Sequence, residues 1–359
     1  MQLTSVEITD LRVIQAMQLQ AAPRLNLVAG FNGAGKTSVL EAIYLLGRGR
    51  TFRHRDAGPM IRKGADRALV VAETVDQASG LSHRIGLSRS RDEFLCRIDG
   101  RDIKRRSELS RALPLQFISS QPQFLLDLGP EVRRRFLDMA VFHVEPDYLA
   151  DLSEYHRCLR QRNAAVRQGN AQAVKPWNAP FAAAAQQIDT RRRGILNRLA
   201  PLVKALAADW ETGFAPDFRY RPGWKQDGSS LEAQLDERLE SDLRLGYTNR
   251  GPHRAELEIS SDADAVAKKL SRGQQKLLVF ALNLGLIDLI RESTARQPIL
   301  LVDDLAAELD SENKMRLLKE LDNRGLQCFI TMIDDQVLPI ACIDQARVFH
   351  VKQGQLSPC

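Results

Sequence analysis

The spacing of hydrophobic and polar positions changes along this chain of 359 residues. Residues 2–29 and 68–120 alternate the two kinds over short runs, which predicts β-strands. From Pro130 onward the hydrophobic positions recur at helical spacing, which predicts helices, including a long one over about 180–211. A continuous apolar run at 298–302 then predicts a buried parallel strand. The pattern is that of an α/β chain with a helical middle part.

The helical middle part has hydrophobic stripes of limited length. Leu149, Leu152, Leu159 and Val166 share one stripe, and Pro201 interrupts the second long helix. A long coiled coil needs hydrophobic positions sustained over several heptads, and a proline inside a helix implies a kink or a break. We therefore expect two packed antiparallel helices rather than an extended rod.

Residues 30–37 read Gly-Phe-Asn-Gly-Ala-Gly-Lys-Thr and match the phosphate-binding P-loop pattern. Glycines let the backbone curl so that successive N–H groups point into one anion-sized concavity. A strand pattern at 25–29 precedes the loop and a helical pattern at 38–46 follows it, as a P-loop requires. A glycine-rich turn without a ligand is the alternative, and the context favours a nucleotide site. Its predicted nucleotide-binding residues are Gly30, Phe31, Asn32, Gly33, Ala34, Gly35, Lys36, Thr37 and Ser38.

Four side chains are expected to carry the chemistry of this site. Lys36 is expected to reach the β- and γ-phosphates and to act in catalysis, and the Thr37 hydroxyl to ligate Mg²⁺. The apolar run at 298–302 ends in Asp303 and Asp304, and the C-terminal end of a buried parallel strand is where an α/β sheet places metal and substrate. We expect Asp303 to hold Mg²⁺ and Asp304 to orient an attacking water.

A second anion-binding element is predicted farther along the chain. Leu270-Ser271-Arg272-Gly273-Gln274 precedes a strongly apolar helix over 277–290. Ser271 is a good N-cap residue, and a helix N-terminus preceded by small residues can bind an anion.

Charge suggests a polyanionic partner, although only weakly. The formal net charge is +6 and the isoelectric point is near 9.1. Arginines gather among glycines at 47–55, and a second basic segment covers 101–111. These segments could contact phosphates of a nucleic-acid backbone or be solvated basic loops, and the residues alone leave both readings open. Arg50, Arg53 and Arg105 are the candidate DNA contacts.

The remaining composition narrows the class of protein. Five cysteines lie scattered without a C-x-x-C pair, which argues against a zinc site or a disulfide framework and fits a reducing compartment. The N-terminus lacks the pattern of a signal peptide, and no apolar run approaches the length of a membrane span. We expect a cytoplasmic protein with no membrane partner.

The three motifs together resemble an ATP-binding-cassette ATPase. Residues 30–37 match Walker A, residues 270–274 the signature, and residues 299–304 Walker B. The long helical, basic insertion between them is similar to that of SMC-like DNA-repair ATPases. The chain resembles the RecF family of bacterial recombination-mediator ATPases over nearly its whole length. The sequence segments that carry this resemblance include Gly-x-Gly-Arg-Thr-Phe-Arg after the P-loop helix, Gly-Pro-His-Arg at 251–254 and Asp-Asp-Leu-Ala-x-Glu-Leu-Asp at 303–310.

The resemblance implies an ATPase lobe built from residues 1–120 and 246–359, with a helical lobe inserted at 121–245. It implies a homodimer that forms head-to-tail around two ATP molecules with Mg²⁺. Ser271 and Gly273 of one protomer would then contact the γ-phosphate bound to Lys36 of the other, and Gln274 is a further predicted nucleotide-binding residue. The implied partners are DNA, especially gapped duplex and junctions of single and double strands, together with RecR and RecO, and RecA indirectly.

Some positions depart from the pattern of transporter cassettes. Asp304 stands where those cassettes carry glutamate, one methylene longer, so we expect slow hydrolysis. No switch histidine is evident at 331–334, and Gln121 and Gln123 are both candidates for the Q-loop glutamine, with Gln121 taken as the metal-site residue. Two other functions stay open: a transporter's nucleotide-binding subunit, which the long motif spacing disfavours, and a DNA clamp that binds ATP without turnover.

Overall fold

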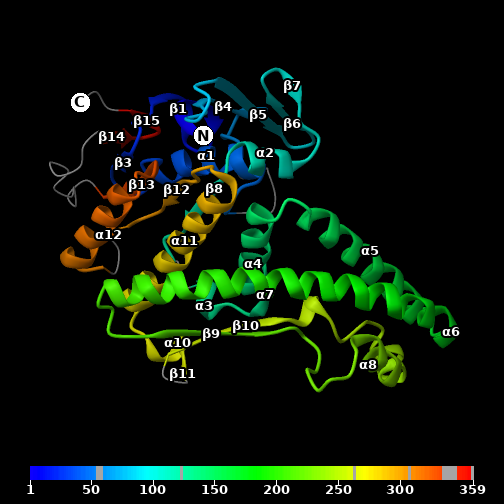
Figure 1. The fold of residues 1–359 in the computed structure, drawn as a ribbon. Coiled ribbons are helices and arrows are strands. Elements are labelled where there is room, and N and C mark those ends of the chain that lie inside the picture. Colours follow the sequence, from blue (N-terminus) through cyan, green and yellow to red (C-terminus); the bar gives the residue numbers. More distant parts are fainter. Residues whose placement is uncertain (54–59, 122–123, 262–263, 306–308, 334–345, 357–359) are drawn as a thin grey trace. The chain divides into compact units, whose positions relative to one another are not determined.

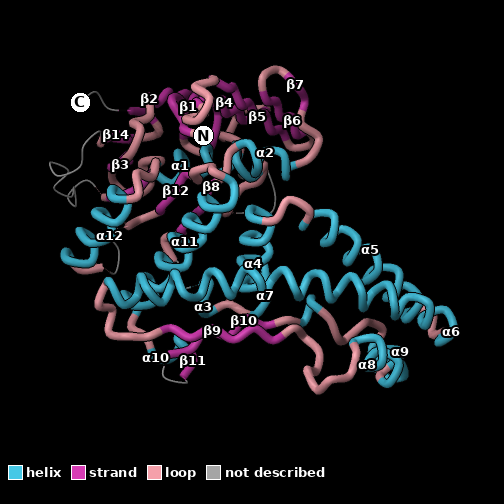
Figure 2. The backbone as a smooth tube through the Cα atoms, viewed as in Figure 1, coloured by secondary structure: helices cyan, strands magenta, loops and turns pink. Residues whose placement is uncertain are grey.

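The computed structural model describes residues 1–53, 60–121, 124–261, 264–305, 309–333 and 346–356 (Figure 1). The chain forms two compact units. Unit 1 combines residues 1–122 with 294–359, and unit 2 covers residues 123–293. Strands make up much of unit 1 and helices most of unit 2 (Figure 2).

Unit 1 contains two six-stranded sheets. The first has the order β2-β1-β4-β5-β6-β7, and every neighbouring pair is antiparallel. Buried and exposed residues alternate along β4, so one face of this sheet is covered and the other is not. Its strands are β1 (Gln2–Leu11), β2 (Ile14–Gln20), β4 (Arg67–Val75), β5 (Ser82–Ser90), β6 (Phe94–Ile98) and β7 (Arg101–Asp102).

The second sheet has the order β15-β14-β3-β13-β12-β8 and is parallel from β14 to β8. Every residue of β3, β12 and β13 is buried, as expected for parallel strands covered on both faces. The P-loop helix α1 (Lys36–Arg48) shares one hydrophobic core with both sheets. The strands are β3 (Leu25–Ala29), β8 (Leu115–Ile118), β12 (Ile299–Val302), β13 (Cys328–Met332), β14 (Arg347–Lys352) and β15 (Gln355–Leu356), and the other helices are α2 (Arg106–Ala112) and α12 (Ser311–Asn323).

Unit 2 is built around two long helices, α5 (Tyr148–Arg167) and α7 (Asn178–Asp209), which pack side by side in opposite directions (Figure 1). The prediction of two packed helices without a long coiled coil is confirmed. Helix α7 continues through Pro201 without a break. The remaining helices are α3 (Phe124–Asp127), α4 (Pro130–Val144), α6 (Ala171–Val174), η2 (Lys175–Trp177), α8 (Leu231–Glu237), α9 (Leu239–Leu245), η3 (Pro252–Arg254), α10 (Val266–Lys269) and α11 (Arg272–Thr294).

A small antiparallel sheet completes unit 2. Its strands are β9 (Pro216–Arg221), β10 (Glu256–Ser261) and β11 (Asp264–Ala265), in the order β11-β10-β9. Because β10 pairs with β9, and Gly285 of α11 lies against Leu199 and Val203 of α7, residues 246–293 are part of the same compact unit as the insertion. The compact units therefore differ from the expected division into 1–120, 121–245 and 246–359 at its second boundary.

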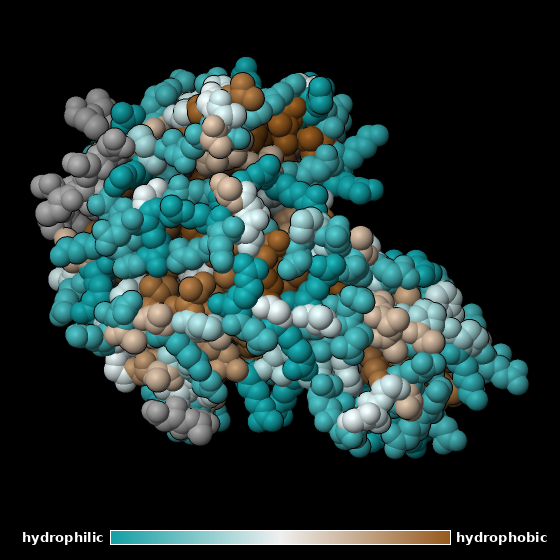
Figure 3. Space-filling view, in the orientation of Figure 1, coloured by the Kyte–Doolittle hydropathy of each residue, from teal (hydrophilic) through white to brown (hydrophobic). Residues whose placement is uncertain are grey.

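The surface is mostly hydrophilic on the face drawn in Figure 3, with hydrophobic side chains showing in separate patches. Within the ranges that the structure describes, no helix combines the length and apolar character needed to cross a bilayer.

Candidate nucleotide site

The loop of residues 30–37 joins β3 to α1, as the motif predicts. Gly33 and Gly35 have φ angles of 80° and 112°, in the left-handed region that favours glycine. A Cβ on Gly30 would lie 2.4 Å from the carbonyl oxygen of Val351, so only glycine fits there. Among the described residues no side chain caps the N-terminus of α1 at Gly35. The first N–H groups of α1 are thus available to an anion.

Lys36 lies over its own loop. Its Nζ donates to the carbonyl oxygens of Gly30 at 2.7 Å and Phe31 at 3.0 Å. The ammonium group is therefore held at the concavity that the loop forms. There it can bind a phosphate oxygen by giving up its hydrogen bond to one of the two carbonyls. Phe31 itself is exposed, with 71% of its surface accessible.

The two Walker motifs meet at Asp303. The Thr37 hydroxyl donates to Asp303 Oδ1 at 3.0 Å, and the Thr331 hydroxyl donates to the same oxygen at 2.8 Å. Asp303 is buried, with 9% of its surface accessible, and its N–H donates to the carbonyl of Ile118 at 2.9 Å. Three neighbouring strands, β8, β12 and β13, thereby fix one carboxylate beside the P-loop.

This oxygen set fits Mg²⁺. A threonine hydroxyl and a carboxylate oxygen 3.0 Å apart are hard ligands of the kind that the ion prefers, and Mg²⁺ usually takes only one or two protein groups together with phosphates and waters. The residues present therefore suit a metal shared with a nucleotide.

Asp304 follows directly and takes an unusual backbone conformation. Its φ angle is +57°, and its N–H donates to the Thr331 hydroxyl at 2.8 Å. Thr331 thus holds the side chain of Asp303 and the backbone of Asp304 together. The structure brings Thr37 and Asp303 together. Thr331 was not predicted as part of the site, because a single threonine at the end of a strand has no motif spacing.

The C-terminal hairpin supports the P-loop. Gly354, in the turn between β14 and β15, donates its N–H to the carbonyl of Ala34 at 2.8 Å. A Cβ on Gly354 would lie 2.3 Å from the carbonyl oxygen of Val13, in the turn between β1 and β2. Two turns from distant parts of the sequence therefore contact the P-loop, and no local sequence pattern predicts this role for Gly354.

The signature element lies in unit 2. Ser271 is exposed directly before α11, its N–H donates to Gln274 Oε1 at 3.0 Å, and its Oγ accepts from the Gln274 N–H at 3.3 Å. Gln274 also donates from Nε2 to the carbonyl of Thr212 at 3.1 Å. This reciprocal cap leaves the hydroxyl hydrogen of Ser271 able to donate to an outside acceptor. Gly273 lies in the first turn of the helix and is partly exposed.

Two further predictions concern the segment after β8. Gln121 is exposed three residues beyond that strand, and no recorded hydrogen bond joins it to Thr37 or Asp303 within the described part of the chain. Its role at the metal stays a prediction. Gln123, the other candidate, lies outside the described residues.

The candidate DNA contacts Arg50, Arg53 and Arg105 are all exposed in unit 1. Gly49 packs against Arg106 and Phe94, so the segment after α1 lies beside the start of α2, where Arg105 is the N-cap. Arg53 is tied to the P-loop helix, because its N–H donates to Thr51 Oγ1 at 3.0 Å and its side chain lies 3.9 Å from Glu41. The structure thus gathers these arginines on one part of unit 1.

Comparison with known proteins agrees with these features. The family model of the RecF/RecN/SMC N-terminal domain matches residues 2–357. The chain is 38% identical to the DNA replication and repair protein RecF of Pseudomonas aeruginosa (strain LESB58), over 99% of this chain and 98% of that protein. It is 36% identical to the protein of the same name from Edwardsiella ictaluri (strain 93-146), over 99% of this chain and 100% of that protein.

Solved structures show the same fold. The structure of the recombination mediator protein RecF-ATP in the RecFOR pathway superposes with a TM-score of 0.87 at 22% identity, covering 99% of this chain and 97% of the other. The Smc head domain from Pyrococcus furiosus gives a TM-score of 0.61 at 14% identity, covering 99% and 95%. At these identities the likeness concerns the fold alone, which is that of an ABC-type ATPase head. By family match and full-length relatives, the chain belongs to the RecF/RecN/SMC family and, within it, to the RecF proteins.

Proposed function

We propose that this chain is an ATP-dependent DNA-binding protein of recombinational repair that closes on DNA as a head-to-tail homodimer. The observation that carries the proposal is the Thr37–Asp303–Thr331 cluster beside Lys36. The relatives are named for DNA replication and repair, which favours this function over a transporter subunit. By its relation to them, the partners would be gapped or junction DNA, RecR and RecO, with RecA loading as the downstream task.

The residues divide the work of the site. Lys36 and the N–H groups at the start of α1 would bind the β- and γ-phosphates, while Thr37 and Asp303 would hold Mg²⁺. When bound, the ion would neutralise phosphate charge. Thr331 keeps Asp304 in place to orient the attacking water. Because aspartate reaches one methylene less far than glutamate, we expect weak hydrolysis that resets the dimer.

Ser271 would complete the site of a second protomer. Its hydroxyl accepts the Gln274 N–H and can donate its hydrogen to a γ-phosphate oxygen. ATP would then contact both protomers only in the closed dimer, so binding of ATP favours association.

Sedimentation with and without ATP tests the proposal. Wild type and Lys63→Ala, an exposed lysine outside the site, should dimerise with ATP, whereas Lys36→Ala should neither bind ATP nor dimerise. Ser271→Asp is the sharper variant, because aspartate also caps a helix but repels a phosphate and lacks the hydroxyl donor. It should bind ATP and stay monomeric, and an ATP-dependent dimer of Ser271→Asp would refute the head-to-tail arrangement.

Two measurements separate the remaining alternatives. Phosphate release by wild type distinguishes a slow ATPase from a clamp that binds ATP without turnover. DNA affinity on gapped and blunt duplexes, with and without ATP, reports the preferred substrate. Contacts by Arg50, Arg53 and Arg105 to phosphates should make this affinity fall steeply with salt, and a salt-independent affinity would argue against them.

A further inference from the structure

A second basic site is formed within unit 2, apart from the Walker motifs. A pocket of about 450 Å³ lies between the segment after β9, the segment before β10, and helix α9. Its lining includes Trp224 and five basic side chains, namely Arg221, Lys225, Arg238, Arg250 and Arg254.

The acids that line this pocket are already neutralised. Asp242 Oδ2 accepts from Arg162 Nη1 at 2.7 Å, and both side chains are almost fully buried. Glu256 pairs with Arg133 at 2.9 Å. Each acid therefore has a cation of its own that does not line the pocket.

Most of the cations of the pocket have no such compensation. Arg221 pairs with Glu258 at 2.8 Å. For Lys225, Arg238, Arg250 and Arg254, no ion pair with an acid is recorded within the described residues. Four positive charges thus converge on one concavity, and an anion placed there would meet them without first breaking a salt bridge.

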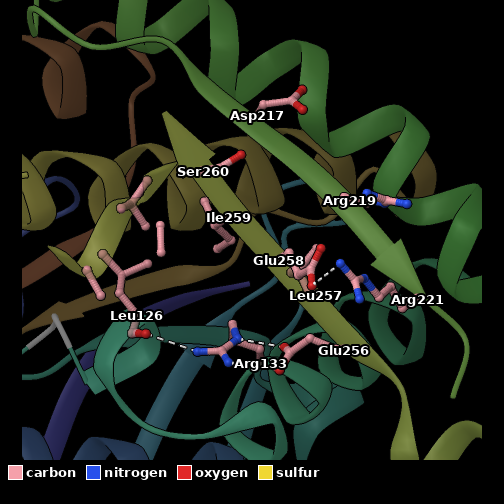
Figure 4. A pocket seen from close by; sticks show the side chains of 13 residues that line it. Leu126, Arg133, Asp217, Arg219, Arg221, Glu256, Leu257, Glu258, Ile259 and Ser260 are labelled. Carbon is pink, nitrogen blue, oxygen red and sulfur yellow. Dashed lines mark hydrogen bonds and ion pairs between the residues drawn. The ribbon is translucent and has the colours of Figure 1, made fainter. Parts of the chain in front are cut away.

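The groove beside the pocket provides a contrast. This groove, of about 580 Å³, shares Arg221 and Glu256 with the pocket and runs along β9 and β10 (Figure 4). There the charges are matched, since Arg133 pairs with Glu256 and Arg221 with Glu258 (Figure 4). Excess positive charge therefore belongs to the pocket and not to the whole face of the small sheet.

The cations stand on a fixed backbone. Gln234, with 2% of its surface accessible, accepts from the Lys225 N–H at 3.1 Å and donates to the Lys225 carbonyl at 2.9 Å. Its Oε1 also accepts from the Arg250 guanidinium. A Cβ on Gly223 would lie 2.3 Å from the Gly251 carbonyl, so the two loops touch backbone to backbone. The backbone at Lys225 and the side chain of Arg250 are thus held in place before any ligand binds.

Trp224 adds an aromatic surface to the same pocket. The ring is partly exposed, and within the described residues no aromatic or cation–π contact is recorded for it. A guanidinium-rich pocket matches the oxygen geometry of a phosphate, and an open indole face can stack a base. An acidic peptide would use the cations but not the ring.

We propose that this pocket binds a nucleotide unit of single-stranded nucleic acid, with the phosphate on Lys225, Arg238, Arg250 and Arg254 and the base on Trp224. This binding goes beyond the proposed ATP-driven clamp. It requires neither ATP nor a second protomer, so the two proposals can fail separately.

Fluorescence anisotropy of a labelled oligothymidylate of about 12 nucleotides, with nucleotide-free protein at low salt, tests the site. Arg238→Glu should weaken binding about tenfold, whereas Arg167→Glu, the same change at an exposed arginine outside the pocket, should weaken it less than twofold. Trp224→Leu should weaken binding roughly tenfold and remove the quenching of tryptophan fluorescence by the strand. Arg238→Gln, which removes charge without adding an acid, should weaken binding by about threefold and serves if Arg238→Glu does not fold.

Competitors identify the ligand. If thymidine monophosphate displaces the labelled strand only at a far higher concentration than unlabelled strand does, the site binds a strand. If both displace it at equal concentration, the site binds a free nucleotide. Both results retain the proposed phosphate and base contacts. Equal effects of the arginine variants at 238 and 167, an unchanged affinity in Trp224→Leu, or displacement by a polyglutamate peptide as effective as that by unlabelled strand would overturn the proposal. ATP-dependent dimerisation should be unchanged in Arg238→Glu.

Discussion

The N-termini of two helices in this molecule, α1 and α11, are capped in different ways. Helix α1 starts at Lys36 after a glycine N-cap, without a side-chain cap among the described residues. Helix α11 starts at Arg272 after Ser271, whose side chain and that of Gln274 cap it reciprocally. The first helix therefore offers backbone N–H groups to a ligand, whereas in the second the exposed Ser271 hydroxyl already accepts the Gln274 N–H.

The difference extends to what surrounds each end. The α1 end depends on residues distant in sequence, because Asp303, Thr331 and Gly354 all contact the P-loop or its partners. The α11 end is completed by short-range bonds within residues 267–275 and by Thr212. A concavity that encloses a ligand, as proposed at the α1 end, needs contacts between residues distant in sequence. A surface that only touches a ligand bound to another protomer, as proposed at the α11 end, needs only a rigid local cap.

The largest effect is expected at the long-range centre. Asp303→Asn should lower Mg²⁺-dependent phosphate release by roughly 100-fold or more, because metal stabilisation of phosphoryl transfer contributes several kcal/mol. The matched control is Asp322→Asn, since Asp322 pairs with Arg24 at the opposite end of β3 from the P-loop. Equal turnover in the two variants would place the metal elsewhere.

The support under the P-loop is the next test. Gly354→Ala combines a φ of +76° with a Cβ 2.3 Å from the Val13 carbonyl, and should cost about 3 kcal/mol of unfolding free energy together with loss of ATP affinity. Gly325→Ala is the control, because its φ is +61° but no atom lies within 4 Å of the added Cβ. It should cost about 1 kcal/mol and leave ATP affinity unchanged. Urea unfolding and nucleotide titration measure both, and similar losses would mean that the hairpin does not support the loop.

The sequence predicts the short-range features of this contrast better than the long-range ones. Glycine spacing around Lys36 and the acids after the apolar strand are local patterns, so the P-loop and the Asp303–Asp304 pair were found. Thr331 and Gly354 act through contacts with residues far away in sequence, and no local pattern reports those contacts. The unit boundary near residue 293 was not predicted for the same reason. It depends on the pairing of β9 with β10, which no local sequence pattern reports.

Unit 2 has a buried polar centre around His253. His253 belongs to the Gly-Pro-His-Arg segment that resembles the RecF family. Its Nδ1 accepts a hydrogen bond from the Tyr155 hydroxyl, 2.6 Å away, and its Nε2 donates to the Thr248 carbonyl at 2.9 Å. Burial lowers the pKa of His253 to about 4. The unfolded chain takes up a proton near the ordinary value of about 6.5, so this contribution to stability is full above that pH and is lost as the pH falls toward 4.

When the pH is lowered from 7 to 5, protonation of His253 in the unfolded chain should therefore reduce the free energy of unfolding by roughly 2 kcal/mol. His253→Asn removes the titrating group and should show a smaller pH dependence, whatever its stability at pH 7. Urea unfolding at the two pH values gives the difference for each protein. If both lose the same free energy, carboxylates and not His253 set the acid sensitivity of unit 2.

The smallest effect is expected at the self-capped helix, and it is also the most discriminating. Ser271→Ala should cost about 1 kcal/mol of stability, the usual cost of removing a serine N-cap. Ser230→Ala should cost a similar amount, because Ser230 caps α8 by accepting from the Ala233 N–H at 3.1 Å. Only Ser271→Ala should also weaken ATP-dependent dimerisation in sedimentation, since its hydroxyl has a second task. If the two variants dimerise equally, Ser271 only caps α11. The two helix N-termini would then differ in how they are capped, and the α11 end would have no role in dimerisation.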